Sequence, residues 1–364
     1  MVTVDSLNLE HVDLIKIDVE GYEMEVLKGA AKTLENVRFL MIELNNNTKK
    51  YGSSNIEVEQ HITSLGYTDN VPQDVEFHQV DCCDLENMTK AMKGCDIVYH
   101  TAATAYEGLS VFSPVLVTKN IFEASVTTIT AAIRNNVKRI VYCSSMARYG
   151  HHDQLPYRED YECRPQDPYG IAKKAGEDVL KNLCETHGVE YVIAVPHNIV
   201  GPRQKYDDPF RNVMSIMLNR MLQGKQPIIY GDGKQQRCFS YIDDCLYCLN
   251  ALAFNKNVVG EVINIGPDEE PVTINELAEA CANETGINLD PIHHKDRPKE
   301  VKLATCSSDK ARKLLDYKTS TNMRQAVSKT AEYIRSRGTK KFQYHLPLEI
   351  VNDITPETWK NKLI

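Results

Sequence analysis

The sequence has no apolar run that approaches the length of about 18 residues needed to cross a bilayer, and its first residues lack the pattern of a signal peptide. It also has no excess of basic residues, since 42 Lys and Arg face 50 Asp and Glu, a formal net charge of -8. A nucleic-acid partner normally requires a basic face. These absences argue against membrane and nucleic-acid roles, and we expect a cytoplasmic protein.

The 11 cysteines show neither the paired spacings of a metal site nor the pattern of a small disulfide-rich secreted chain. Cys245 and Cys248 form a CxxC on a helical pattern, but no second pair accompanies them. His293 and His294 are adjacent, so their side chains diverge and no acidic residue has the spacing of a third ligand. We therefore expect buried thiols and no metal.

What the sequence does contain is an ordinary globular composition, with 364 residues of which 42% are hydrophobic and 25% charged. This length predicts two or more domains, or one domain with an attached piece. The most informative stretch is 139–177. It begins with an apolar run, Ile140–Cys143, which is followed by Ser144 and Ser145. This pattern predicts a buried parallel strand that ends in hydroxyl groups.

The same stretch ends with Tyr169 and Lys173 at the start of a helical pattern. A spacing of four places both side chains on one helix face. An ammonium there can lower the pKa of the phenol from about 10 toward that of a general base. With the Ser145 hydroxyl on the same substrate oxygen, the three groups suit proton removal from a sugar alcohol while a hydride leaves its carbon. The alternative is a solvated helix face, because YxxxK is common by chance.

SSMARYG at the strand end and PYGIAKKAGE after a Pro-rich loop resemble the extended short-chain dehydrogenase/reductase family, in particular its nucleotide-sugar 4-epimerases, with the pattern SSxxxYG then PYxxSK. The resemblance continues in order for some 250 residues. It implies that Tyr169 is the acid/base, that Lys173 orders the nicotinamide ribose of NAD, and that Ser145 is the hydroxyl on the substrate side. Ser144 and Pro196, at two strand ends, are implied cofactor contacts.

Residues 1–70 do not fit that pattern. His11–Asp18 and Phe39–Leu44 are predicted buried strands, and Glu23–Leu34 is a predicted amphipathic helix between them, which together make a βαβ unit. DLIKIDVEGYEMEVLKGA followed by FLMIEL resembles the C-terminal half of the FkbM-type methyltransferases. Asp18 and Glu20 are then either remnants of a methyltransferase site or a routine acidic loop entry.

From Val75 the chain resembles the reductase family again, from its third strand onward. Val75–Val80 is a predicted strand that leads to Asp81 and Cys82, the implied adenine contacts. Thr101, Ala102 and Ala103 match the small residues that pass over the pyrophosphate and ribose, where backbone approaches the ligand closely. Asn120 lies near the structural asparagine of the family, and the VxGT that follows there is replaced by FEAS with an extra residue.

The Gly-rich motif of a dinucleotide-binding domain is missing. Neither GxGxxG nor GxxGxxG occurs before Val75, and no acidic residue follows a second strand to bind the adenosine ribose. The family's first strand, helix and second strand, on the order of 50 residues, are replaced by the methyltransferase-like segment. Either this segment supplies its own strands to a joint sheet, or two truncated neighbours are fused. NAD binding is therefore in question.

Predicted substrate contacts follow in the second half of the chain. Asn198 stands in PHNIVGP, where the family has RxxNxxGP, although Val195 replaces the Arg. Arg237 in QQRCFSY resembles the family arginine that binds the diphosphate, with Cys238 in place of an Asp. A guanidinium offers the bidentate donors that suit a diphosphate. By the same resemblance, Arg297 and the nearby Glu300 reach the nucleotide phosphate and ribose.

These observations predict an α/β protein: a Rossmann-like parallel sheet truncated at its N-terminus, a smaller α/β substrate part (mainly 197–225 and 265–345) and an N-terminal βαβ segment, with domains at 1–70 and 71–364. The predicted activity, in surface polysaccharide sugar synthesis, is NAD-dependent epimerization at C4 by transient oxidation. Met146 and Ala147 offer no acid for the alternative reactions, 4,6-dehydration and decarboxylation. A further alternative is a catalytically inactive nucleotide-sugar binder.

Two further expectations concern assembly and the end of the sequence. The predicted helices Glu123–Asn135 and Gly170–His187 would pair across a homodimer, by resemblance to the family. Gly338–Ile364, which contains Trp359, reads as a polar tail wrapped on the surface.

Overall fold

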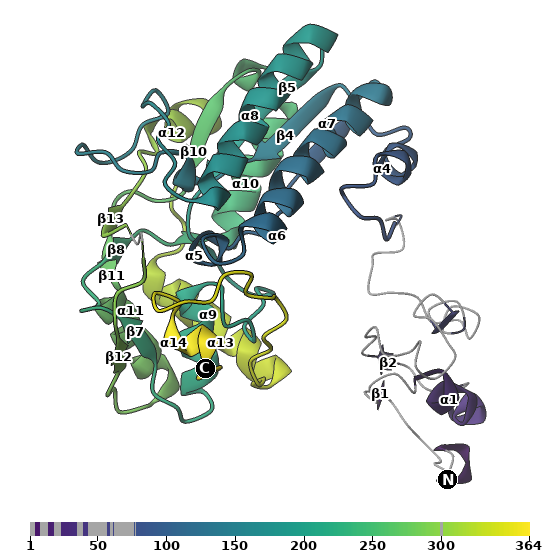
Figure 1. The fold of residues 1–364 in the computed structure, drawn as a ribbon, viewed down its shortest axis with the longest axis vertical. Coiled ribbons are helices and arrows are strands. Elements are labelled where there is room, and N and C mark those ends of the chain that lie inside the picture. The colour runs from purple at the N-terminus through teal and green to yellow at the C-terminus, as the bar shows by residue number, and fades with distance from the viewer. Residues whose placement is uncertain are drawn as a thin grey trace. The chain divides into compact units, whose positions relative to one another are not determined.

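A computed structural model describes residues 4–7, 14–17, 23–34, 39–42, 57–58, 61, 76, 78–298 and 301–364. The chain separates into two compact units, Met1–Gln79 and Val80–Ile364. Each unit has its own secondary structure (Figure 1), so each is described by itself.

The first unit contains the predicted βαβ pattern. The strands β1 (Leu14–Ile17) and β2 (Phe39–Ile42) pair in parallel, with Leu14 opposite Phe39. Between them lie two short helices, α1 (Glu23–Lys28) and α2 (Ala31–Leu34), after the 3-10 turn η1 (Val4–Leu7). The single helix expected over Glu23–Leu34 is thus interrupted at Gly29, a residue with poor helix propensity. Asp18 and Glu20 lie outside the described residues.

The second unit is built on a four-stranded parallel sheet in the order β10-β5-β4-β3. The strands are β3 (Ile97–His100), β4 (Arg139–Cys143), β5 (Glu190–Pro196) and β10 (Val262–Ile265). Along β4, Ile140 and Tyr142 pack into one core cluster and Val141 into another. This alternation buries both faces of the sheet, as the continuous apolar runs predicted.

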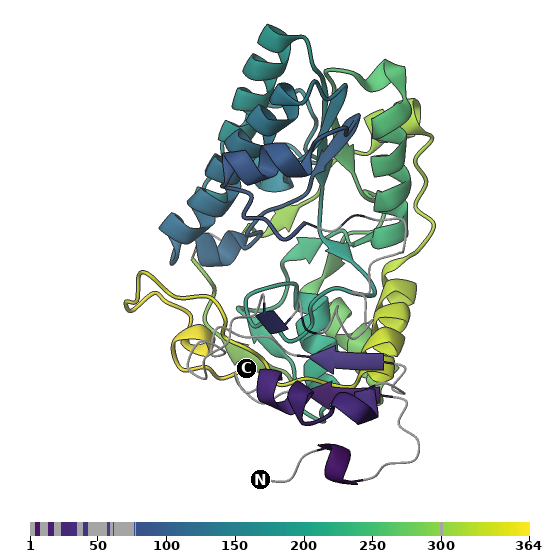
Figure 2. The ribbon, with the colours of Figure 1, turned by 90° about the vertical axis from the view of Figure 1, so that its right-hand side faces the viewer.

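Helices cover both faces of this sheet. On one side lie α7 (Ala124–Arg134) and α8 (Pro168–His187), and on the other α10 (Ile242–Phe254) and α12 (Asp309–Leu315). Figure 2 shows the same layers within this unit from the side, with the blue and teal helices opposite the green ones. The smaller elements α4 (Leu85–Ala91), α5 (Glu107–Ser110), α6 (Pro114–Thr118), η4 (Met146–Arg148) and η5 (Lys256–Val258) fill the connections.

Two details differ from the sequence-based expectation. The strand predicted over Val75–Val80 is wrong, because its described residues, 76 and 78–80, form no strand. The sheet strands expected beside it are missing from the sequence, and a strand without a ladder partner is not stable. The extra residue at FEAS appears as a π-helical turn, η3 (Lys119–Glu123), directly before α7. One inserted residue in a helix produces this kind of bulge.

The predicted smaller α/β part packs around its own core of three helices: α9 (Val213–Met221), α11 (Ile274–Thr285) and α13 (Met323–Arg337). The predicted capping box of Thr273 and Glu276 starts α11. Short strands pair around this core: β6 (Ile199–Val200), β7 (Ile228–Tyr230), β8 (Gln236–Arg237), β9 (Ser240–Tyr241), β11 (Val272–Thr273), β12 (Ile292–His294) and β13 (Leu303–Ala304).

The polar tail lies on the surface, as expected, since most residues of 339–364 are exposed or half-buried. Trp359, in α14 (Glu357–Lys360), anchors it: the side chain is only 3% exposed and packs with Tyr106, Phe112 and Phe210 in one aromatic cluster. Its Nε1 donates a hydrogen bond to the Pro209 carbonyl at 3.2 Å. A single tryptophan carries enough apolar area to hold an otherwise polar segment in place.

Candidate active site

Tyr169 and Lys173 lie on the first turns of α8, on one face as their spacing predicted. The helix begins there because the Asp167 side chain accepts a hydrogen bond from the Gly170 backbone N–H at 2.9 Å and Pro168 occupies the first position. Both side chains are almost completely buried, with exposed fractions of 8% for Tyr169 and 2% for Lys173. They are not the solvated helix face of the alternative interpretation.

Ser145 lies at the end of β4, where the strand turns into η4. Its Oγ accepts a hydrogen bond from the Ala147 backbone N–H at 3.2 Å. Ser145 lies close enough to the Tyr169 phenol to lower its pKa. The structure therefore places near each other the two hydroxyl groups that the sequence analysis assigned to one substrate oxygen.

The expected lowering of the phenol pKa by Lys173 is wrong for this structure. Burial raises the pKa of Tyr169 to about 12, against the smaller opposing effect of Ser145. The Lys173 Nζ donates instead to the Cys143 carbonyl at 2.8 Å and lies 5.5 Å from the centre of the Tyr142 ring. Burial also lowers the pKa of Lys173 to about 8. At neutral pH the phenol is therefore protonated and the amine mostly charged.

Behind these groups lies a buried cluster that the sequence analysis missed. Glu177 is fully buried, its Oε1 accepts a short hydrogen bond from the Ser144 Oγ, and its Oε2 lies 2.8 Å from Arg148 Nη2. Its place in the sequence was a usable signal, because Tyr169, Lys173 and Glu177 repeat at intervals of four along one helix face. Ser144, which was predicted to contact the cofactor, is 5% exposed, and its hydroxyl bonds to Glu177.

The other predicted cofactor contacts are more open. Asp81 and Thr101 are exposed, while Cys82, Ala102, Ala103 and Pro196 are half-buried. The Asp81 Oδ1 accepts a hydrogen bond from the Cys83 backbone N–H at 2.9 Å. The Asn120 Nδ2 donates to Thr104 Oγ1 at 3.0 Å, which ties η3 to the segment after β3.

Of the predicted substrate residues, Asn198 adopts a left-handed conformation, with φ of 44°, and its Nδ2 donates to the Cys238 carbonyl at 2.9 Å. Arg237 Nη1 donates to its neighbouring Gln236 carbonyl at 2.8 Å. The Arg297 guanidinium lies 4.9 Å from the centre of the Tyr230 ring. Glu300 lies outside the described residues.

Arg297 and Trp359 of the C-terminal tail both lie close to Gly108 in α5. A Cβ atom at this position would lie 3.4 Å from Trp359 Cη2 and 3.6 Å from Arg297 Nη1. Because α5 also packs against α8, with Ser110 Oγ 3.4 Å from Asp167 Oδ1, Arg297 approaches the element next to the catalytic helix.

A second cation near the phenol was also missed. The exposed Arg211 lies with its Cζ 5.5 Å from the centre of the Tyr106 ring, and Tyr106 OH donates to the buried Asp208 at 2.5 Å. Among the charges that act on the pKa of Tyr169, Glu107 raises it and Arg211 lowers it. Sequence spacing gave no sign of Arg211, since it belongs to the substrate part of the chain.

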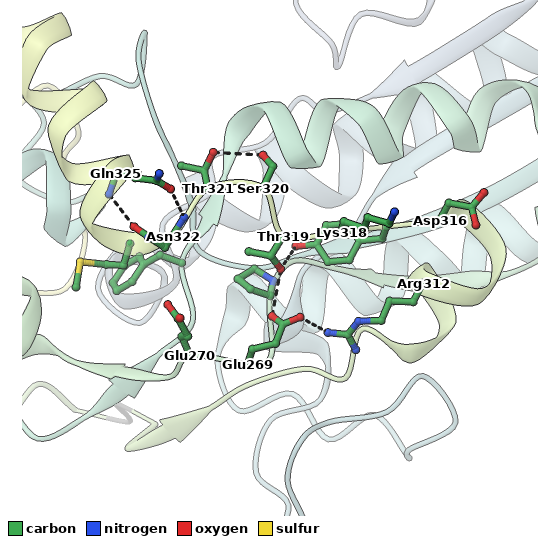
Figure 3. A pocket seen from close by; sticks show the side chains of 14 residues that line it. Glu269, Glu270, Arg312, Asp316, Lys318, Thr319, Ser320, Thr321, Asn322 and Gln325 are labelled. Carbon is green, nitrogen blue, oxygen red and sulfur yellow. Dashed lines mark hydrogen bonds and ion pairs between the residues drawn. The ribbon is translucent and has the colours of Figure 1, made fainter.

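The cavity in Figure 3 is a different place from this cluster. It has a volume of about 670 Å³ and is lined by residues that follow β10, the end of α12 and the start of α13. Its polar side chains bond to one another: Arg312 Nη2 lies 2.5 Å from Glu269 Oε1, and Thr319 Oγ1 donates to Glu269 at 3.1 Å. None of the predicted site residues lines it.

Two further observations concern metals and membranes. Within the described residues, no three His, Cys, Asp or Glu side chains are grouped to hold a metal ion, and Cys245 and Cys248 are buried in the core as expected. None of the described helices is both long and apolar enough to cross a bilayer.

A family model described as the NAD dependent epimerase/dehydratase family matches residues 42–266. The chain belongs to this family. A second model, the methyltransferase FkbM domain, matches residues 1–68 of this epimerase/dehydratase family member, which confirms the resemblance of the leading segment. A candidate UDP-glucose 4-epimerase from Methanocaldococcus jannaschii is 30% identical over 75% of this chain and 88% of its own length.

Solved structures share the fold of this family member. The UDP-glucose 4-epimerase of Thermotoga maritima, with UDP-glucose, is similar with a TM-score of 0.70 and 24% identity, covering 90% of this chain and 99% of that chain. The UDP-glucose 4-epimerase of Thermus thermophilus, in complex with NAD, has a TM-score of 0.68 and 22% identity, covering 88% and 98%. Other relatives are named GDP-mannose 3,5-epimerase, UDP-N-acetyl-alpha-D-glucosaminuronate decarboxylase and dTDP-glucose 4,6-dehydratase.

Proposed function

We propose that this chain carries out nucleotide-sugar 4-epimerization by transient oxidation of the sugar C4 hydroxyl. The observation that carries the proposal is the burial of Tyr169 and Lys173 on one face of α8, against the end of β4 where Ser145 lowers the pKa of Tyr169 and the Cys143 carbonyl accepts from Lys173. Ser145 would hold the sugar hydroxyl, and Tyr169 would take its proton and later return it. The bound NAD of the family supplies the hydride acceptor.

The proton transfer places a condition on Tyr169. With a pKa raised to about 12 by burial, its phenol is a proton donor rather than a base at neutral pH. To act as a base, it needs a positive charge close to the oxygen. Lys173, one helical turn along the same face, and Arg211 are the cations of this chain that can supply one. Activity that depends on charged Lys173 should therefore decline as the pH rises through about 8.

The cofactor fits one end of the site better than the other. The buried ammonium of Lys173 and the phenol of Tyr169 would hold the nicotinamide ribose, and the partly exposed stretch Thr101–Ala103 leaves room for the backbone to approach the ligand. The Gly-rich loop that normally surrounds the pyrophosphate is absent from the sequence. This absence favours the second candidate function, a nucleotide-sugar binder without catalysis.

For the substrate we infer a nucleoside diphosphate sugar. Arg237 and Arg297 would bind the diphosphate, because a guanidinium presents paired donors to phosphate oxygens, and Asn198 would help to shape the loop around it. The loop residues Met146 and Ala147 provide no acid for dehydration. Glu107, whose charge acts on the pKa of Tyr169, is the carboxylate to replace if a dehydrated keto sugar is formed.

The test is to incubate the full chain with UDP-glucose, UDP-GlcNAc or UDP-glucuronate and added NAD, and to follow the anomeric protons by NMR. Interconversion of C4 epimers that is lost in Tyr169→Phe supports the proposal. A keto-sugar product indicates a dehydratase, and saturable binding of the nucleotide sugar without turnover indicates the binder. A titration with NAD, followed by protein fluorescence, separates failure of cofactor binding from failure of chemistry.

We further infer a homodimer through α7 and the exposed side of α8, where Ile171 is 53% exposed, acting in the cytoplasm in surface polysaccharide sugar synthesis. Light scattering after size exclusion tests the dimer, and a monomer at micromolar concentration would contradict it.

A further inference from the structure

The buried ion pair of Arg148 and Glu177 lies directly behind the candidate active site. The guanidinium and carboxylate are 2.8 Å apart, and their side chains are 4% and 0% exposed. Removing two charges from water is costly, and apolar residues of similar size often pack at least as well. A pair retained at such a place therefore calls for a role beyond filling the core.

The connections of the pair indicate that role. Glu177 accepts a hydrogen bond from the hydroxyl of Ser144, the residue between Cys143 and Ser145. The Cys143 carbonyl accepts from Lys173 Nζ at 2.8 Å, and Ser145 lies close enough to Tyr169 to lower its pKa. Ser144, the middle one of these three residues, is thus bonded to Glu177 of α8. Its neighbours Cys143 and Ser145 lie beside Lys173 and Tyr169.

Arg148 closes the cluster from the other side. It is the last residue of η4, the turn that begins directly after Ser145. Its guanidinium also lies 5.1 Å from the centre of the Tyr149 ring. The strand end, the turn and the helix therefore meet at one buried carboxylate, one helical turn beyond Lys173.

We propose that Ser144, Glu177 and Arg148 form a positioning triad that holds the end of β4 and η4 against the catalytic face of α8 and keeps the Lys173 ammonium charged. The inference rests on the proposed function, because it assigns these residues to the geometry of Ser145, Tyr169 and Lys173. They do not touch the substrate themselves, so they are positioning residues.

The electrostatic half of the proposal follows from the surroundings of Lys173. Burial lowers the pKa of Lys173 to about 8, while the Cys143 thiol and the Glu177 carboxylate raise it. The titratable and charged groups that face Lys173 come from β3, β4 and α8: His100, Tyr142, Cys143, Tyr169 and Glu177. His100 has its pKa lowered by burial to about 3, so it is neutral. Burial raises the pKa of Glu177 against the lowering effects of Arg148 and Ser144, and the Glu177 carboxylate raises the pKa of Lys173.

The first experiment measures the titration of Lys173 directly and needs no turnover. The full chain is labelled with lysine carrying ¹³C at Cε, and the Lys173 resonance is assigned by its loss in Lys173→Arg. Glu177→Gln keeps an acceptor oxygen for Ser144 but removes the charge, so the midpoint of Lys173 should fall by about one pH unit. The matched control is Glu190→Gln, since Glu190 pairs at 2.6 Å with the buried Arg139 at the opposite end of the strands. It should leave the midpoint unchanged.

The second experiment tests the tether. Ser144→Ala removes the hydroxyl but keeps the ion pair, and kcat should fall about 10- to 100-fold, with KM nearly unchanged and partial rescue in Ser144→Thr. If Glu177→Gln does not fold, Arg148→Met/Glu177→Leu replaces it. This double variant should fold and show a low kcat. Its Lys173 midpoint should lie below that of the wild type because the carboxylate is gone, but above that of Glu177→Gln, in which the Arg148 cation remains.

The proposal is overturned if folded Glu177→Gln leaves the Lys173 midpoint where Glu190→Gln leaves it, or if Ser144→Ala turns over as the wild type does. A wild-type chain that binds nucleotide sugar but shows no turnover would contradict the proposed function instead. The Lys173 titration would then still decide whether the triad keeps the Lys173 ammonium charged.

Discussion

The two ends of the candidate nucleotide site are built in different ways. At the catalytic end, Tyr169 and Lys173 are nearly buried. Lys173 donates a hydrogen bond to the Cys143 carbonyl at the end of β4, and the adjacent Ser145 lowers the pKa of Tyr169. At the far end, Asp81 and Thr101 are exposed and the Gly-rich loop is absent from the sequence. The catalytic end is thus held by contacts within one strand–helix pair, β4 and α8, and these contacts do not involve the segment in which a Gly-rich loop would lie.

The largest effect is expected at the buried end. Tyr169→Phe removes the hydroxyl that exchanges the proton, so kcat should fall by about 10²- to 10⁴-fold, while nucleotide-sugar affinity measured by calorimetry stays within a few-fold. Tyr161→Phe, a half-buried tyrosine of the loop before α8, is the control. Equal turnover of Tyr169→Phe and the wild type would remove the basis for epimerization.

The aromatic cluster beside α5 should depend on the C-terminal tail for its stability. Trp359→Ala leaves a cavity beside Phe210, whose ring centre lies 5.4 Å away, and removes the contact with α5. We expect a loss of about 3–5 kcal/mol in the free energy of unfolding, measured by urea denaturation. Leu363→Ala, at a position 48% exposed, should cost little. A loss no larger than that of Leu363→Ala would mean that the tail does not stabilise this aromatic cluster.

Lys173→Met should separate stability from activity. The pKa of Lys173 is lowered in the folded chain to about 8, so its charge costs stability below that pH, and the cost fades as the pH rises through 8 toward the unfolded value of about 10.4. The variant loses the bond to Cys143, yet it should gain about 1–2 kcal/mol at pH 7 and lose turnover. Chemical denaturation at pH 7 and pH 10, with Lys174→Met as control, checks this. A gain that does not shrink at pH 10 would contradict the assigned pKa.

The smallest effect is expected at the open end. Asp81→Asn removes one exposed carboxylate, so we expect NAD affinity to weaken by about 1 kcal/mol or less, measured by fluorescence titration. Asp84→Asn, which keeps a capping side chain for α4, is the control. A loss of more than about 100-fold, or about 2.7 kcal/mol, would show that this end is as tightly specified as the catalytic one.

The sequence predicted the parallel sheet and the catalytic cluster because both are encoded locally. Ile140–Cys143 is a short apolar run between polar residues, and Tyr169 and Lys173 have helical spacing beside a proline and a capping Asp167. Periodicity detects such features directly.

Other features depend on partners far apart in the sequence. The raised pKa of Tyr169 follows from burial, which spacing does not reveal. Arg211, from the substrate part of the chain, acts on the pKa of Tyr169, and the Ser144 hydroxyl bonds to Glu177, 33 residues further along the chain. The strand expected at Val75–Val80 needed a neighbour that the sequence lacks, so its apolar pattern alone was not sufficient.

The anchored tail also has a consequence for synthesis. Glu349 accepts hydrogen bonds from the Val115 and Leu116 backbone N–H groups at 2.9 Å, and Ser113 Oγ donates to the Pro347 carbonyl at 2.6 Å. Domains generally begin to fold from the N-terminal side as the chain leaves the ribosome. The sheet can therefore form first, but residues 339–364 emerge last among those that complete this unit. A nascent chain would therefore hold Tyr169 and Lys173 on α8 before Trp359 completes the aromatic cluster beside α5.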